Sequence, residues 1–300
     1  MTHDVSLPAQ ATPALPEVRT ITPADLKDAL LKGLDDFSAL PSHAVFISVI
    51  YPILGLVLAR LTLGYEVLPL LFPLAAGFAL LGPFAAIGLY ELSRQREQGR
   101  PVSWRDALDV LHAPSFGAIV TLGLMLMALF VVWVALAHAI YVANFGYASP
   151  ASLSQFLSDV FTTRAGWNLI IAGNAVGFVF ALVALMVSAV SFPLLLDRDI
   201  GVTAAVTTSM RLIRKNPLTM ALWGLIVAAG LVLGSLPAFI GLAVVMPVLG
   251  HATWHLYRAA VKADAFAPRT YHEPQRGRRY AADFPVSLFK ASSDADPRPK

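Results

Sequence analysis

His251 and His255 are the residues whose types and spacing most suggest chemistry, because they lie four residues apart in an apolar stretch. On a helix, residues four apart lie on the same face. Two carboxylates, Glu91 and Asp197, also follow a proline near the end of an apolar stretch, as the histidines follow Pro247. If these stretches converge, the four side chains would form an inner polar cluster. Such a cluster could bind a divalent cation, relay protons or hold haem through an imidazole.

A structural role is the competing interpretation for the same four side chains. Two histidines at this spacing are a weak metal signal without further ligands. At the end of a membrane helix, Asp197 can simply be solvated, and the two histidines can extend to the interface or hydrogen-bond to carbonyl groups. The sequence therefore leaves a metal site open, with His251 and His255 as its candidate ligands. It identifies no cofactor and no catalytic residue.

His138 and Asn174 are a second candidate pair, and they lie in the apolar stretches 116–142 and 167–196. Both residues are near the end opposite to the cluster described above. A hydrogen bond between the two helices would satisfy both polar side chains inside an apolar environment. We predict this bond and expect it to serve structure rather than transport.

Standard enzyme signatures are missing from the sequence. There is no phosphate-binding loop ending in Gly-Lys-Ser/Thr, no His-Glu-x-x-His and no Gly-x-Ser-x-Gly. The absence of cysteine excludes disulfides and thiol catalysis. The basic residues flank apolar stretches and do not form a basic, aromatic surface, so nucleic acid is not a predicted partner. We expect a protein that is not an enzyme.

The elements that must position these residues are long apolar helices. Hydrophobic residues make up 57% of the chain and charged residues 14%, against about 25% charged in soluble domains. A membrane helix needs about 20 largely apolar residues. Six stretches meet this length: 43–63, 67–92, 116–142, 167–196, 217–235 and 237–257. The sequence thus predicts an all-α, polytopic membrane protein with about six transmembrane helices, and the lipid bilayer as its partner.

The distribution of basic residues predicts the orientation of these helices. Lysine and arginine concentrate in cytoplasmic loops. With six spans, 20 of the 22 basic residues lie on one side, and only Arg60 and Arg164 lie on the other. Both termini are therefore expected in the cytoplasm.

An amphipathic segment that ends just before a proline precedes each pair of apolar stretches. Thr22 and Asp25 cap the first segment, Ser103 and Asp106 cap the second, and the third covers 202–214. The prolines that end the segments are Pro41, Pro114 and Pro217. The predicted unit is an interfacial helix followed by a helical hairpin, three times, with one more surface helix in the loop 143–166. Amphipathic connectors are also common in unrelated membrane proteins, so a true repeat stays open.

Three segments are predicted along the chain. Residues 1–42 form a cytoplasmic segment with an amphipathic helix and without a cleavable signal peptide. Residues 43–260 form the six-helix transmembrane domain. Residues 261–300 form a basic tail, expected to be disordered. Arg276, Arg278 and Arg279 in this tail could contact anionic lipid headgroups, and a simply solvated tail is the alternative.

The stretches 15–60, 191–199 and 247–258 resemble the domain-of-unknown-function 2189 family of bacterial integral membrane proteins. The resemblance covers roughly residues 17–260. It implies a multi-pass protein of the bacterial inner membrane, and it brings no established activity and no site residues.

Two classes of function stay open at this point. The first is a non-enzymatic membrane protein that transports or senses a small solute or acts as a scaffold. The alternative is a metal- or haem-binding membrane protein associated with respiratory or envelope machinery, which would depend on His251 and His255.

Overall fold

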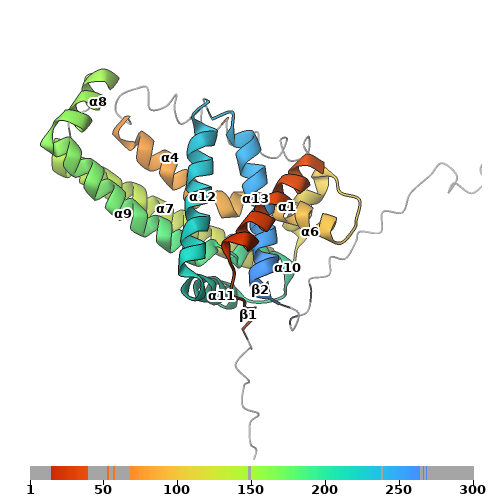
Figure 1. Cartoon of the computed structure of the whole chain (residues 1–300). Coiled ribbons are helices and arrows are strands. Elements are labelled where there is room, and N and C mark those ends of the chain that lie inside the picture. Colours follow the sequence, from red (N-terminus) through yellow and green to blue (C-terminus); the bar gives the residue numbers. More distant parts are fainter. Residues whose placement is uncertain are drawn as a thin grey trace, which may run out of the picture. The chain divides into compact units, whose positions relative to one another are not determined.

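The computed structural model describes residues 15–39, 68–147, 150–237 and 239–263, together with positions 53, 57, 266 and 268. These residues are almost entirely helical (Figure 1), which confirms the predicted all-α class. Most of the predicted span 43–63, Pro41 and nearly all of the basic tail, including Arg276, Arg278 and Arg279, lie outside the described residues. The predicted segment boundaries stay predictions.

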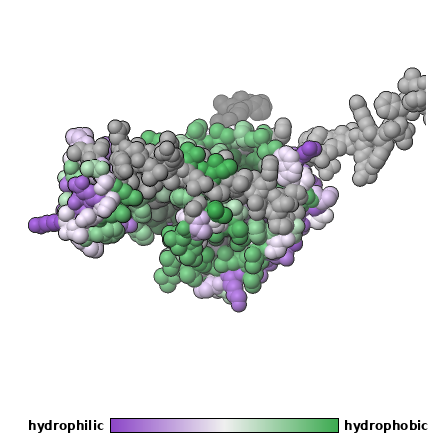
Figure 2. All heavy atoms as spheres, turned by 90° about the horizontal axis from the view of Figure 1, so that it is seen from above, coloured by the Kyte–Doolittle hydropathy of each residue, from purple (hydrophilic) through white to green (hydrophobic). Residues whose placement is uncertain are grey.

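Three described helices are long and apolar enough to cross a membrane. They are α7 (Phe116–Phe145), α9 (Arg164–Ser188) continued by α10 (Ser191–Asp197), and α12 (Pro217–Ser235). Their outer faces leave large apolar side chains uncovered, such as Phe178, 69% exposed, and Leu225, 65% exposed. Figure 2 shows hydrophobic residues over much of the described surface on the face seen from above. Apolar faces of this extent suit lipid rather than water.

The predicted span 67–92 is not one continuous helix. It consists of η1 (Leu68–Leu70), α4 (Leu71–Leu80), α5 (Gly82–Ala85) and α6 (Ile87–Glu97), with turns at Leu81 and Ala86. Pro83 gives the physical reason, because it lacks the amide hydrogen that would continue the helical hydrogen bonding of α4. The indole Nε1 of Trp133 donates to the carbonyl of Pro73 at 2.8 Å, and this bond ties the interrupted segment to α7.

The last helix, α13 (Leu242–Ala260), begins later than predicted and is more buried than the candidate spans α7 and α12. A turn around Phe239, whose φ is 65°, separates it from α12. The two helices meet closely, since a Cβ added at Gly241 would lie 2.8 Å from the carbonyl oxygen of Gly234. The C-terminal half of α13 packs against α6 and α1 (Pro23–Ala39).

Structured segments occupy all three predicted amphipathic regions. They are α1, η2 (Trp104–His112), which is a 3₁₀ helix, and α11 (Val202–Lys215). The predicted caps are confirmed: the amide of Thr22 donates to Asp25 at 2.7 Å, and the amide of Ser103 donates to Asp106 at 2.6 Å. The predicted surface helix in the loop 143–166 is α8 (Leu153–Thr162).

A short antiparallel sheet joins the two ends of the described chain. β1 (Glu17–Val18) pairs with β2 (Val261–Lys262), with Glu17 opposite Lys262. Asn216 holds the same N-terminal segment, because its Oδ1 accepts from the amide of Ile21 at 2.9 Å and its Nδ2 donates to the carbonyl of Arg19 at 3.0 Å. The segment before α1 and the segment after α13 therefore lie side by side.

Candidate functional site

A buried carboxylate on α1 is at the centre of the polar site. The buried face of α1 includes Gly33 and, three residues later, Asp36, which is 4% exposed. A Cβ added at Gly33 would lie 2.6 Å from the backbone nitrogen of Ala252, so α1 crosses α13 almost backbone to backbone. This close crossing lets the short side chain of Asp36 reach both α13 and α6.

Asp36 accepts hydrogen bonds from two neighbouring helices. Its Oδ2 accepts from Ser93 Oγ at 2.6 Å on α6 and lies 2.8 Å from His255 Nε2 on α13. Its Oδ1 accepts from Arg96 Nη1, while Arg96 Nη2 donates to Asp35 at 2.8 Å. Burial disfavours the charged carboxylate, but the bonds from His255, Ser93 and Arg96 outweigh it and hold the pKa of Asp36 at about 2.

The two predicted histidines do converge, and Ser93 joins them through Asp36. Ser93 Oγ lies 2.7 Å from His251 Nδ1. The single hydroxyl proton of Ser93 points to Asp36, because an ionised carboxylate only accepts. His251 must therefore carry its proton on Nδ1 and donate to Ser93 Oγ. In the neutral imidazole its Nε2 is then an acceptor, and this atom is buried without a hydrogen-bond partner among the described residues.

Glu91, predicted in the same cluster, belongs to a different group of hydrogen bonds. It is fully buried on α6. Arg94 donates to both of its carboxylate oxygens, at 2.8 Å each, and Gln95 donates to Oε1 at 2.8 Å. Arg94, three residues further along the same helix, thus neutralises Glu91 locally, and Gln95 adds a neutral hydrogen bond.

Asp197 belongs to a third group, which ties the end of α10 to α13. Its Oδ2 accepts from the hydroxyl of Tyr257 at 2.7 Å and from Arg198 Nε at 2.9 Å, and Arg258 Nη1 lies 3.5 Å away. These hydrogen bonds thus divide the four predicted residues among three groups. Only His251 and His255 of the four meet at the Asp36 group.

These hydrogen-bonded groups do not form a metal centre in the part of the chain that the structure describes. Among the residues that the structure describes, no three His, Asp or Glu side chains come together as a metal-binding group. His255 Nε2 and His251 Nδ1 are both engaged, with Asp36 and Ser93 respectively. The geometry holds three helices together, and Nε2 of His251 is a buried nitrogen without a hydrogen-bond partner among the described residues.

The predicted bond between His138 and Asn174 is not formed. Both side chains are exposed, and Asn174 Nδ2 donates instead to the carbonyl of Ile170 at 2.7 Å. A carbonyl one turn earlier on the same helix is always within reach of a short amide side chain. This local bond satisfies Asn174 without a second helix.

Asp36, Ser93 and Arg96 were missed by reasoning from the sequence. A signal was present in α1, because Leu26, Ala29, Gly33 and Asp36 follow one another at helical spacing on a single face. A carboxylate in register with a buried face requires partners from elsewhere. Those partners are 57 to 219 residues away in the chain, and nothing local reveals them.

The fold and its lipid-facing helices define an integral membrane protein. Residues 71–197 match the family model described as predicted integral membrane protein (DUF2189). The predicted resemblance to this family is confirmed over these residues, which include α4 to α10 and two of the three candidate spans. The other two stretches that suggested it, 15–60 and 247–258, lie outside the match. No curated protein and no solved structure matches the chain.

Proposed function

We propose that the chain is a non-enzymatic, multi-pass scaffold protein of the bacterial inner membrane, with both termini in the cytoplasm. One observation carries the proposal: the buried Asp36 group fastens the N-terminal helix α1 to α6 and α13 through Ser93, Arg96 and His255. Because α1 is fixed in this way, it presents a rigid surface on the side where β1 and β2 pair.

The orientation of the polar side chains supports a scaffold over a solute path. A path through a membrane needs polar groups that face a water-filled cavity. The carboxylates of Asp36, Glu91 and Asp197 instead point at arginine, serine, histidine and tyrosine side chains from the protein itself. The pairings of Asp36 and Asp197 reach other helices and support a role in holding those helices in register.

The proposed topology has six spans arranged as three hairpins. Three spans are the candidate helices, and the interrupted segment 68–97, α13 and the stretch 43–63 would supply the others. The 20-to-2 distribution of basic residues supports cytoplasmic termini. The pairing of β1 with β2 supports placing both ends of this domain on one side.

A proton-conducting function is the second candidate, because His251, Ser93, Asp36 and His255 form a continuous hydrogen-bonded chain. Such chains relay protons in transporters. The metal- or haem-binding alternative depends on the open Nε2 of His251, and a visible absorption band or stoichiometric metal in purified protein would favour it.

Proton flux into liposomes separates the scaffold from the relay. Purified protein is reconstituted into liposomes that contain a pH-sensitive dye, and a pH gradient is then applied. The scaffold proposal predicts the same rate of proton entry as in protein-free liposomes, with an ionophore added last to show that the vesicles are sealed. Faster entry that His251→Gln abolishes would reject the scaffold and assign the chain to proton movement.

A further inference from the structure

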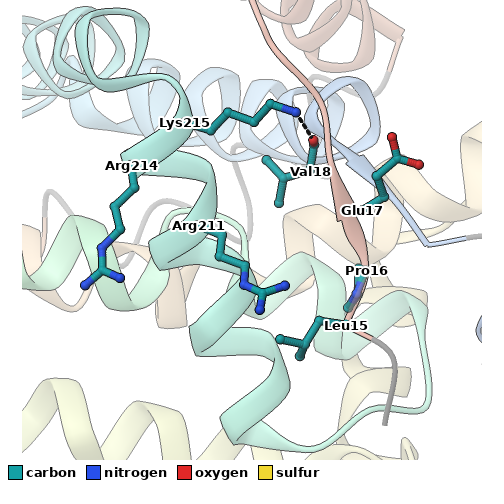
Figure 3. Close-up of a pocket in the computed structure, with 7 residues that line it drawn as sticks. All are labelled: Leu15, Pro16, Glu17, Val18, Arg211, Arg214 and Lys215. Atoms are coloured by element: carbon teal, nitrogen blue, oxygen red, sulfur yellow. Dashed lines mark hydrogen bonds between the residues drawn. The ribbon is translucent and has the colours of Figure 1, made fainter. Parts of the chain in front are cut away.

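A basic groove lies between β1 and α11, away from the Asp36 group (Figure 3). Its volume is about 620 Å³. It is lined by Leu15, Pro16, Glu17, Val18, Arg211, Arg214 and Lys215. Three cations and several apolar side chains therefore share one surface depression.

Hydrogen bonds fix both walls of the groove. Lys215 Nζ donates to the carbonyl of Val18 at 2.6 Å, as the dashed line in Figure 3 shows. Thr219 Oγ1 donates to the carbonyl of Ile21 at 3.1 Å, beside the bonds that Asn216 makes to the same segment. The N-terminal segment is thus held over the junction of α11 and α12, and the groove exists before any ligand arrives.

Two guanidinium groups in the groove have no carboxylate partner among the residues that the structure describes. Arg211 and Arg214 are exposed, and within the described part of the chain neither forms an ion pair. The acidic residue of the groove, Glu17, lies on the opposite side of β1 in Figure 3, and its carboxylate is 3.4 Å from Lys262 Nζ. Uncompensated, planar guanidinium groups are well suited to bind a phosphate.

If α12 spans the membrane as proposed, the groove lies at the level of the phospholipid headgroups. The candidate span α12 begins at Pro217, two residues after Lys215. Leu218, in its first turn, is 85% exposed, and exposed apolar side chains continue along the helix to Leu225 and Val232. The cations would meet the phosphate headgroup of a lipid, and the apolar face of α12 that follows them would meet its acyl chains.

We propose that Arg211 and Arg214 bind the phosphate of an anionic phospholipid whose acyl chains lie along α12. Lys215 is a positioning residue, because it holds β1 against α11. A free phosphate would satisfy the guanidinium groups but would gain nothing from the exposed leucines, so the site favours the lipid over the soluble anion.

Native mass spectrometry of the detergent-purified chain tests this site by titration with phosphatidylglycerol. We expect phosphatidylglycerol to bind more tightly than phosphatidylcholine. The variant R211Q/R214Q should weaken phosphatidylglycerol binding roughly 30-fold, which corresponds to about 1 kcal/mol for each basic residue. The control R105Q/R164Q removes the same charge from exposed positions elsewhere and should bind as the wild type does.

Three outcomes would overturn the proposal. Equal weakening in R105Q/R164Q would mean general charge attraction and no site. Unchanged binding in R211Q/R214Q would place the lipid elsewhere. Displacement of the lipid by an equal concentration of inorganic phosphate would make the groove a site for a soluble anion.

Discussion

Replacing Asp36 by alanine is expected to destabilise the protein by about 3–5 kcal/mol, the cost of removing one member of a buried, paired group of charges. Ser93, Arg96 and His255 would each lose the hydrogen bond that they make to Asp36. The measurement is the free energy of unfolding in detergent, followed by loss of helical circular dichroism.

Asp35 supplies the matched control, since it is the preceding residue and also pairs with Arg96. Its side chain is 71% exposed, and Arg96 Nη2 lies 2.8 Å from its Oδ2. Exposed ion pairs contribute about 0–1 kcal/mol, so Asp35→Ala should cost less than 1 kcal/mol. Equal losses for the two variants would mean that Asp36 does not hold the helices together.

The carboxylate of Asp36 should also make the free energy of unfolding depend on pH. The pKa of Asp36 is about 2 in the folded protein, against an ordinary value of 3.8. A lowered pKa stabilises the folded state above pH 4, and this stabilisation of about 2 kcal/mol is lost as the pH falls toward 2. Asp36 faces His251, His255 and Arg96, with Asp35 beside it, so Asp36→Asn is the variant that isolates its contribution. Wild type and Asp36→Asn with the same decline below pH 4 would contradict this assignment.

Replacing Gly33 by alanine should destabilise the chain by about 2 kcal/mol, through overpacking at the crossing of α1 and α13. The new Cβ would lie 2.6 Å from the backbone nitrogen of Ala252, and backbone atoms cannot yield as a flexible side chain can. The expected result is a lower midpoint of thermal unfolding, and faster cleavage within α1 by a protease.

The same chemical change at Gly173 is the control. Gly173 lies within α9, and a Cβ there would meet nothing within 4 Å. Alanine favours a helix over glycine by up to about 1 kcal/mol, so Gly173→Ala should leave the midpoint unchanged or raise it. A Gly33→Ala variant that is as stable as Gly173→Ala would show that α1 does not dock closely on α13.

The features that the sequence predicted well depend on neighbours along the chain. The caps at Thr22 and Ser103 depend on a carboxylate three residues later, and both formed as predicted. The end of α11 before Pro217 depends on the backbone restriction that proline imposes. Such local chemistry is the same whatever the rest of the protein does.

The features that differ from the prediction depend on a break within a helix or on competition between near and distant partners. The apolar stretch 67–92 is long enough to span a membrane, yet Pro83 interrupts it. Glu91 was grouped with the histidines, although Arg94 and Gln95 lie within its reach on the same helix. Asp36 contacts its partners only because α1, α6 and α13 cross at this point. The periodicity of the sequence does not predict that crossing.

Topology is the central claim of the proposed function, and single cysteines test it most directly because the chain has none of its own. The variants are Glu17→Cys and Lys262→Cys in the paired strands and Tyr147→Cys after α7, where Tyr147 is 88% exposed. Spheroplasts are treated with a membrane-impermeant maleimide, before and after lysis. The proposal predicts that Tyr147→Cys reacts in intact spheroplasts, and that Glu17→Cys and Lys262→Cys react only after lysis. Labelling of Lys262→Cys in intact spheroplasts, with Tyr147→Cys protected, would contradict the proposed orientation.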